Sequence, residues 1–257
     1  MFILKGIEQE RFFLYFIPKI NIDPIKQKFR SYQKELLDNP FIPFRDIKKN
    51  MEELAFINHR LGGHHITLQG VKALLKNHKR QEPVQITEIG CGGGNNLFTI
   101  QKWAEKNHVK VELTGIDINK ECIAFAKEQP QNKDIRFICS DYRSVMLLPS
   151  RQVVFSSLFC HHFTDEELVF QLKWMYRNSS IGFFINDLHR HPLAYYSIKL
   201  LTSIFSKSYL VKNDAPLSVE RGFIRKEWSN LFQQANIEDF TCQWKWAFRW
   251  LVICRKK

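Results

Sequence analysis

Glycines crowd the junction between a short β-type run and a helical pattern, and this spacing suits nucleotide binding. The run Val84–Ile89 leads into Gly90-Cys91-Gly92-Gly93-Gly94, and the helical pattern begins near Asn95. Glycine lets the backbone turn sharply and approach a ligand closely. The first turn of a helix offers free N–H groups to that ligand. The stretch therefore predicts a nucleotide-type binding corner.

The spacing of the glycines excludes two common nucleotide motifs. The dinucleotide fingerprint needs a small residue at its sixth position, which is Asn95 counted from Gly90 and Leu97 counted from Gly92. A P-loop is excluded as well, because the stretch has no Gly-Lys-Ser/Thr. What it does contain is an acidic residue followed by alternate glycines, namely Glu88, Gly90, Gly92 and Gly94.

Two further acids follow the next two β-type runs. Asp117 lies in Gly115-Ile116-Asp117-Ile118, 23 positions after Gly94, and Asp141 lies in Cys139-Ser140-Asp141-Tyr142. A carboxylate at the tip of the second strand suits ribose hydroxyls, and one at the third suits the amino group of adenine with Tyr142 beside the ring. Each acid alone reads equally well as a solvated turn residue, but their order along successive strands favours ligand binding.

The elements that would position these residues alternate between strand and helix. The predicted strands are 84–89, 111–117, 135–139, 153–157 and 181–186, with helices at 97–106, at 121–129 and from a capping box at Thr164-Asp165-Glu166-Glu167. This alternation predicts an α/β fold, a doubly wound and mostly parallel sheet with helices on both faces. A helix at 226–235 then precedes two strands, 237–244 and 250–254, which predict an antiparallel hairpin at the sheet edge.

Helical patterns also flank this core. Residues 31–37, 43–60 and 67–77 read as helices, with the glycines of Leu61-Gly62-Gly63-His64-His65 ending the second of them. We expect residues 1–80 to form a helical extension or cap and 81–257 to form the binding domain. Within that domain, residues 188–225 read as a lid insert with a helix at 193–205 and a polar loop at Asn213-Asp214-Ala215-Pro216.

The glycine stretch and the two aspartates resemble class I S-adenosylmethionine-dependent methyltransferases, over roughly residues 84–257. The resemblance implies a Rossmann-like seven-stranded sheet of order 3-2-1-4-5-7-6, whose strand seven is antiparallel. It implies S-adenosylmethionine as the cofactor, with Glu88 near the methionine end, Asp117 at the ribose and Asp141 at the adenine. The full implied cofactor set is Glu88, Gly90, Cys91, Gly92, Gly94, Asp117, Ile118, Asp141, Tyr142 and Ser157. An NAD-binding protein is the minor alternative.

The segment after the fourth strand bears on the methyl acceptor. Ser156-Ser157-Leu158-Phe159-Cys160-His161-His162-Phe163 lacks the Asn/Asp-Pro-Pro-Tyr of nucleobase amino-methyltransferases, and it resembles the ubiquinone/menaquinone-biosynthesis-like group. That group methylates small, often phenolic or quinol, acceptors. We expect O-methylation with His162 or His161 as the general base, since an imidazole titrates near neutrality. One of the two histidines alternatively caps the helix at Thr164. The other functional readings are C-methylation of a quinol-like ring, a nucleic-acid or protein methyltransferase, and a non-catalytic cofactor-binding module.

Several polar residues are candidates for the acceptor pocket, and no metal site is expected. The candidates are His64, His65, Asp187, His189 and Asp214, each of which has a solvated-loop alternative. The motif Leu61–His65 and the run 213–218 resemble methyltransferases of polyketide and aromatic pigment pathways, which implies an aromatic acceptor. Catechol-type methyltransferases hold magnesium with an Asp-Asn after strand five. Here the order is Asn186-Asp187, and a histidine stands at the strand-four position, so we expect no metal.

The composition of the chain limits the kinds of binding partner and the cellular compartment that we expect. The chain has 257 residues, 44% of them apolar, and a net charge of +12. The charge permits attraction to nucleic acid or anionic lipid, but it lacks a matching catalytic motif, so nucleic acid is not the expected partner. The six cysteines form no CxxC pair and suit reduced thiols in a cytoplasmic protein. No apolar stretch reaches membrane-spanning length, although the aromatic cluster at 12–16 suits a weak peripheral membrane contact.

Overall fold

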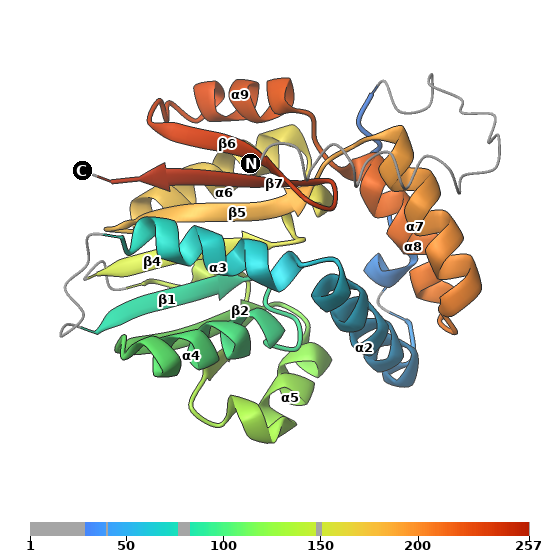
Figure 1. Cartoon of the computed structure of the whole chain (residues 1–257), viewed down its shortest axis with the longest axis horizontal. Coiled ribbons are helices and arrows are strands. Elements are labelled where there is room, and N and C mark those ends of the chain that lie inside the picture. Colours follow the sequence, from blue (N-terminus) through green and yellow to red (C-terminus); the bar gives the residue numbers. More distant parts are fainter. Residues whose placement is uncertain (1–28, 40, 77–82, 148–150, 257) are drawn as a thin grey trace, which may run out of the picture.

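A computed structural model of the chain describes residues 29–39, 41–76, 83–147 and 151–256 (Figure 1). The predicted aromatic contact at 12–16 lies outside these residues. Among the described residues, no helix is both long enough and apolar enough to cross a membrane.

A seven-stranded sheet forms the centre of the fold. Its strands are β1 (Val84–Ile89), β2 (Val111–Asp117), β3 (Arg136–Cys139), β4 (Gln152–Ser157), β5 (Gly182–Leu188), β6 (Phe240–Lys245) and β7 (Arg249–Arg255). They lie in the order β3-β2-β1-β4-β5-β7-β6, and β7 runs antiparallel to both of its neighbours. The predicted doubly wound sheet with its terminal hairpin is therefore confirmed.

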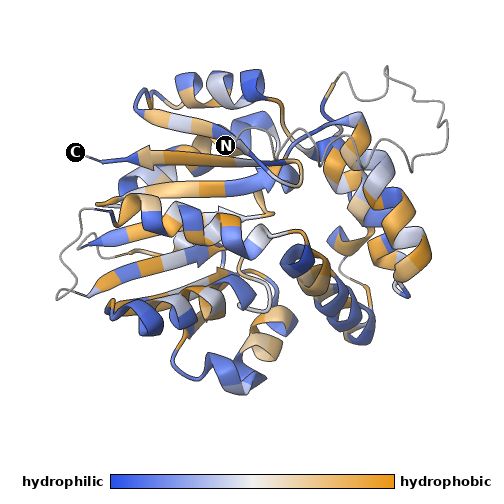
Figure 2. Cartoon of the chain, in the orientation of Figure 1, coloured by the Kyte–Doolittle hydropathy of each residue, from blue (hydrophilic) through white to orange (hydrophobic). Residues whose placement is uncertain are grey.

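Helices cover both faces of the sheet because the buried strands are apolar on both sides. One face packs against α3 (Gly63–Leu74), α4 (Asn95–Asn107) and α5 (Lys120–Glu128), and the other packs against α6 (Asp165–Asn178) and α9 (Arg225–Gln234). Three more helices, α2 (Phe44–Arg60), α7 (Pro192–Phe205) and α8 (Tyr209–Arg221), lie beyond the ends of the parallel strands (Figure 1). Figure 2 shows that much of β7 and α7 is hydrophobic.

The predicted start of α6 is confirmed in its detail. The Thr164 hydroxyl accepts a hydrogen bond from the Glu167 N–H at 3.3 Å, and the Glu167 carboxylate accepts one from the Thr164 N–H at 2.9 Å. This reciprocal capping box satisfies two N–H groups that a helix start leaves without partners. It also fixes the start of α6 directly after the segment that carries His161 and His162.

Two predicted elements are wrong, because contacts with remote parts of the chain determine their secondary structure. The predicted helix at 31–37 is an extended segment ending in one 3-10 turn, η1 (Leu36–Asp38), and Asp214 accepts hydrogen bonds from the N–H groups of Leu36 and Leu37. The predicted polar loop at 213–216 is instead the middle of α8, with Pro216 inside the helix. Buried Leu210, Val211 and Leu217 hold α8 in place and outweigh the local preference of proline for helix ends.

The third N-terminal helix begins earlier than predicted. Gly62 adopts a left-handed backbone with φ of +76°, and α3 starts immediately afterwards at Gly63. His64 and His65 therefore lie in the first turn of α3 rather than in a turn between helices. Asn77, the predicted end of this helix, lies outside the described residues.

Candidate active site

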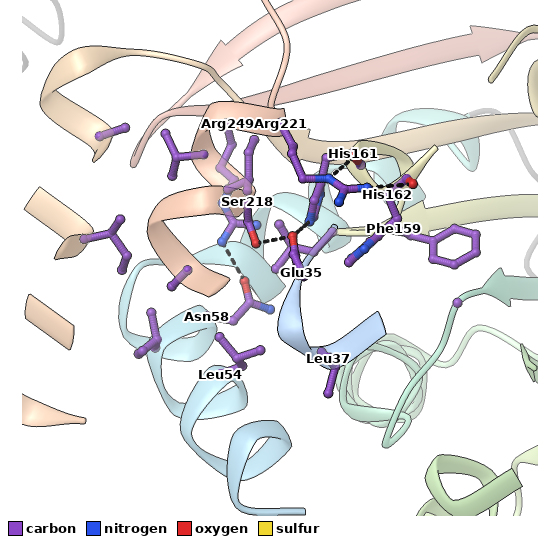
Figure 3. Close-up of a pocket in the computed structure, with 18 of the residues that line it drawn as sticks. Glu35, Leu37, Leu54, Asn58, Phe159, His161, His162, Ser218, Arg221 and Arg249 are labelled. Carbon is purple, nitrogen blue, oxygen red and sulfur yellow. Dashed lines mark hydrogen bonds and ion pairs between the residues drawn. The ribbon is translucent and has the colours of Figure 1, made fainter. Parts of the chain in front are cut away.

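A cavity of about 1140 Å³ lies at the carboxyl ends of the parallel strands, where doubly wound sheets bind ligands. Its wall runs from the glycine loop, Gly90 and Gly92, to the helices α2, α7 and α8. Figure 3 shows a close-up of side chains that line it. Drug-sized ligand pockets span roughly 300–1,000 Å³. The cavity is therefore large enough for a cofactor and an acceptor together.

The glycine loop is tightly packed at Gly90 and open at Gly92. Gly90 has φ of +67°, and its N–H donates to the Ile116 carbonyl at 2.8 Å, which ties the loop to β2. A Cβ at position 90 would lie 2.2 Å from the Phe159 ring. Gly92 has φ of +49° and no heavy atom within 4 Å of such a Cβ, so open space remains beside its backbone. That open space is what a ligand lying along the loop requires.

Asp117 lines the cavity at the end of β2 and is linked to the glycine loop. Its carboxylate accepts hydrogen bonds from the N–H groups of Gly92 and Asn119, both at 2.9 Å. Burial raises the pKa of Asp117, although those N–H groups oppose the rise. An added pair of hydroxyl donors would satisfy the remaining lone pairs of this carboxylate. The position suits the predicted role at the ribose.

Glu88 lies buried beneath the loop. Its Oε1 accepts a hydrogen bond from the Asn96 amide at 2.8 Å, while its Oε2 has no partner among the described residues. Burial, together with the nearby charge of Asp117, raises the pKa of Glu88 well above its ordinary value. A buried oxygen without a partner is costly and calls for a donor. Glu88 does not line the cavity, so the open space at Gly92 is the feature that directly fits a bound cofactor.

Other residues of the predicted cofactor set lie outside the cavity wall. Asp141 accepts a hydrogen bond from the Arg143 guanidinium at 2.8 Å, and this pairing holds the pKa of Asp141 below its ordinary value. Tyr142 is buried against Trp174, with ring centroids 5.1 Å apart. Ile118 is 71% exposed. The remaining three are buried at strand or loop ends: Cys91, Gly94 and Ser157.

His161 and Asp187 form a buried pair at the cavity wall. His161 Nδ1 lies 2.8 Å from Asp187 Oδ1, and the N–H of Cys160 donates to Asp187 Oδ2 at 2.8 Å. Burial by itself raises the pKa of Asp187, but the charge of His161 and the hydrogen bonds to the carboxylate lower it. An ionised carboxylate only accepts hydrogen bonds, so Nδ1 of His161 carries the proton. In neutral His161 the basic atom is therefore Nε2.

Glu35 stands opposite that basic nitrogen. His161 Nε2 lies 3.6 Å from Glu35 Oε1, which also accepts a hydrogen bond from the Ser218 hydroxyl at 2.7 Å (Figure 3). Burial raises the pKa of Glu35, although the charges of His162 and Arg221 oppose the rise. An oxygen atom about 2.8 Å from both Nε2 and Oε1 satisfies ordinary hydrogen-bond distances. One hydroxyl group beside the pair can therefore contact both atoms.

His162 also lines the cavity, but its support differs. Its Nδ1 lies 3.6 Å from Asp38 Oδ1, and its side chain is more exposed than that of His161. Its contact with the more exposed Asp38 is longer than the 2.8 Å contact between His161 and fully buried Asp187. The structure thus brings both predicted histidines to the cavity and gives them unequal surroundings.

Arg221 holds the backbone of the histidine segment. Its guanidinium donates to the carbonyls of His161 at 2.9 Å and His162 at 2.7 Å (Figure 3). It also donates to the carbonyl of Gln33 at 2.6 Å. Arg30 in turn donates to the Arg221 carbonyl at 3.0 Å. These bonds join three segments that are far apart in the sequence and fix the backbone that presents His161.

The far end of the cavity is apolar and aromatic. Phe248 stacks on His191 with ring centroids 5.1 Å apart, and burial lowers the pKa of His191. His189 accepts a hydrogen bond from Trp244 at 3.2 Å, and burial lowers the pKa of His189 to about 4, so it is neutral at pH 7. The wall is completed by Leu54, Ile57, Leu61, Leu193, Ala194, Ile198 and Leu201.

The remaining predicted pocket residues are placed elsewhere. His64 and His65 lie on α3 and do not line the cavity, and burial lowers the pKa of His64 to about 4. Asp214 is buried and accepts the hydrogen bonds from η1. His189 is part of the wall, while Asp187 does not line it and contacts His161.

A metal ion has one set of candidate ligands among the described residues. Atoms of Glu35, His161 and His162 lie within 4.8 Å of one another. A metal-bound histidine usually donates its other nitrogen to a carboxylate, and Asp187 stands at that position. The same geometry suits a general base, so it does not by itself specify a metal.

Four residues of the wall had no signal in the sequence: Glu35, Asn58, Arg221 and Arg249. Glu35 and Asn58 come from segments read only as helices, and Arg249 comes from the predicted turn between the last two strands. Their partners are remote in the sequence: Ser218 lies 183 positions from Glu35, and His161 lies 60 positions from Arg221. Arg221, at the end of α8, lay within the predicted lid insert, which was the single indication.

Comparisons with known proteins agree with this architecture. A family model described as a methyltransferase domain matches residues 86–182. No curated protein sequence matches the chain. Solved structures of methyltransferases are similar to it in fold, at under 25% identity.

The structure of a plantazolicin methyltransferase in complex with S-adenosylhomocysteine is 21% identical, covers 80% of this chain and 75% of that one, and has a TM-score of 0.55. Human N-acetylserotonin methyltransferase, in complex with S-adenosylmethionine, is 17% identical over 90% of this chain and 64% of that one, with a TM-score of 0.58. Magnesium protoporphyrin IX methyltransferase from Synechocystis PCC 6803 is 14% identical over 78% and 87%, with a TM-score of 0.51. These similarities in fold cover most of the chain.

Proposed function

We propose that this S-adenosylmethionine-dependent methyltransferase of class I fold methylates a hydroxyl group of a small aromatic acceptor, with His161 as the general base. One observation carries the proposal. The hydrogen bond between Asp187 and His161 Nδ1 leaves Nε2 as the basic atom, on the cavity wall beside Glu35. The sequence favoured His162 modestly, and the surroundings of the two rings favour His161.

The cofactor would be held by the glycine loop and Asp117. Gly90 and Gly92 allow close approach, Asp117 would accept from the ribose hydroxyls, and Glu88 supplies a buried acceptor beneath the loop. When bound, S-adenosylmethionine supplies a methyl group on a positively charged sulfur. The fit rests on the open space at Gly92 and on the position of Asp117 in the cavity wall.

The chain's own residues would then handle the acceptor proton. A hydroxyl held by His161 Nε2 and Glu35 would give its proton to Nε2 as its oxygen takes the methyl group, which the cofactor would supply while its sulfur keeps the electron pair of the broken bond. Asp187 stabilises the imidazolium that forms, as the aspartate of a catalytic triad does. Arg221 holds the backbone of His161 through its carbonyl, which would keep the imidazole ring facing the acceptor.

The cavity supports a small acceptor rather than a macromolecule. Residues of α7, α8 and η1 line its wall, and its far end is lined by Phe248, His191 and apolar side chains. Two of the similar structures are named for acceptors that contain aromatic rings, protoporphyrin and N-acetylserotonin. A helical cap is expected within residues 1–80, and we propose that α2 is that cap because it lines part of the cavity.

Transfer of labelled methyl tests the proposal. The protein is incubated with methyl-labelled S-adenosylmethionine and a panel of phenols, quinols and hydroxylated polycyclic aromatics, and products are analysed by mass spectrometry and NMR. An O-methyl product whose formation needs His161 supports the proposal. A product methylated on carbon or nitrogen, or a panel without turnover while an RNA or protein substrate accepts label, overturns it.

A further inference from the structure

Arg249 is a buried cation on the cavity wall with unused donors. The residue is only 4% exposed, and its Nη2 donates to Asn58 Oδ1 at 3.1 Å. Its Nη1 has no hydrogen-bond partner among the described residues. Figure 3 shows Arg249 reaching Asn58 beside Ser218 and Arg221. A guanidinium presents its donors as a planar fork, so one arm is anchored and the other is free to bind.

Burying a charge without a full set of partners is costly, so its presence requires an explanation. The nearby carboxylate of Asp187 does not supply the missing partner, because hydrogen bonds from His161, Cys160 and Leu188 already occupy it. Burial lowers the pKa of Arg249 to about 10, partly opposed by the charge of Asp187, so Arg249 remains charged at neutral pH. The site is therefore a fixed positive charge with an unpaired donor.

The position of Arg249 places it with the acceptor rather than the cofactor. Arg249 begins β7 and pairs with Leu188 at the end of β5. The sheet order β1-β4-β5-β7 sets its backbone three strands from the glycine-loop strand, about 14 Å at the usual strand spacing. Its neighbour Phe248 belongs to the aromatic end of the cavity.

We propose that Arg249 binds a carboxylate of the methyl acceptor, so that the acceptor is an aromatic acid rather than a neutral phenol. The proposal rests on the function proposed above and names the substrate class of the same site. Arg249 binds and orients the acceptor, and takes no part in proton transfer. A carboxylate matches the planar fork of the guanidinium, with Asn58 holding the other side of it.

Binding, rather than turnover, tests this inference, so that its failure is distinct from failure of the catalytic proposal. Hydroxyaryl carboxylates of one to three rings, each paired with its primary amide, are titrated into protein saturated with S-adenosylhomocysteine. Thermal shift identifies binders and calorimetry gives affinities. We expect at least one carboxylate to bind about tenfold more tightly than its amide, and Arg249→Met to remove that preference.

Three variants keep the result interpretable. Arg60→Met removes a guanidinium that packs on Phe56 away from the cavity and should keep the preference. Arg249→Lys keeps the charge without the fork, and it replaces Arg249→Met if circular dichroism shows that variant unfolded; most of the preference should be lost. Titration of S-adenosylhomocysteine into Arg249→Met should give unchanged affinity.

Two results overturn the inference. One is a panel in which no carboxylate binds better than its amide. The other is an Arg249 variant that weakens S-adenosylhomocysteine binding and leaves the carboxylate preference intact, because the carboxylate bound would then be that of the cofactor.

Discussion

Asp187 Oδ1 lies 2.8 Å from His161 Nδ1, although the two residues are 26 positions apart in the chain. The parallel pairing of β4 with β5 produces this contact, since Asp187 is on β5 and His161 comes just after β4. The carboxylate also accepts from two N–H groups of the histidine segment, those of Phe159 and Cys160. Asp187 thus fixes both the backbone and the tautomer of His161, which makes this pair the centre of the proposed chemistry.

We expect His161→Gln to lower kcat by about 10²–10⁴-fold, the usual contribution of a positioned general base. The affinity for S-adenosylhomocysteine should change little, because His161 is proposed to act on the acceptor. Steady-state kinetics with an identified acceptor and calorimetry measure the two effects. His162→Gln is the matched control and should cost less. If the His162 variant loses as much activity and the His161 variant retains it, the base is His162.

Asp117→Asn should weaken cofactor binding by roughly 10–100-fold, since a hydrogen bond to a charged group contributes about 1.5–3 kcal/mol. The amide could not accept from both ribose hydroxyls and the Gly92 N–H as the carboxylate is proposed to do. Calorimetric titration of S-adenosylmethionine measures the loss. Asp141→Asn, whose carboxylate already pairs with Arg143, should show a smaller loss. Equal affinity of Asp117→Asn and the unaltered protein would remove Asp117 from the cofactor site.

Local signals in the sequence predicted the sheet well. Strand ends followed by glycine or aspartate, and the capping box at Thr164, are decided within a few residues and therefore appear in the structure. Pro216 led to a wrong prediction of a loop. Its local preference for a helix end was outweighed by buried neighbours along α8. The predicted helix at 31–37 is wrong for a similar reason. The segment around Glu35 is held extended by a hydrogen bond from the Leu36 N–H to Asp214, 178 positions away.

The cavity wall was predicted only in part. The glycine loop, Asp117 and the two histidines come together because each follows a strand of one parallel sheet. Glu35, Asn58, Arg221 and Arg249 reach the same cavity through contacts between remote segments, and no spacing rule connects them. Residue type alone could not separate Arg249 from the rest of the 38 lysines and arginines of this basic chain.

Gly90→Ala and Gly92→Ala should separate folding from cofactor binding. At position 90 the new methyl group would meet the Phe159 ring at 2.2 Å, so we expect a loss of about 2–4 kcal/mol from steric overlap and the left-handed backbone. At position 92 it would enter open space, so only the backbone strain of about 1–2 kcal/mol applies. Urea unfolding measures both. Calorimetry should show that Gly92→Ala still weakens cofactor binding. Similar unfolding free energies for the two variants would contradict the packing around Gly90.

Glu35→Gln should stabilise the protein at higher pH. Burial raises the pKa of Glu35 in the folded state. The folded state therefore holds the proton more tightly than the unfolded chain, whose carboxyl titrates near 4.5. The contribution of Glu35 to stability is fully present below pH 4.5 and is lost as pH rises through the folded pKa.

The amide that Glu35→Gln introduces cannot ionise, so the variant keeps its unfolding free energy where the unaltered protein loses it. Urea unfolding of both proteins at pH 4 and pH 8 measures the difference, and the gain from Glu35→Gln should be larger at pH 8. Ser218→Ala is the control, because it removes the hydrogen bond to Glu35 and leaves the titrating group in place. A gain that is the same at both pH values would mean that Glu35 is ionised in the folded protein without penalty. It would then face His161 as a permanent carboxylate, and the hydroxyl proposed to lie between them would be held by two acceptors at once.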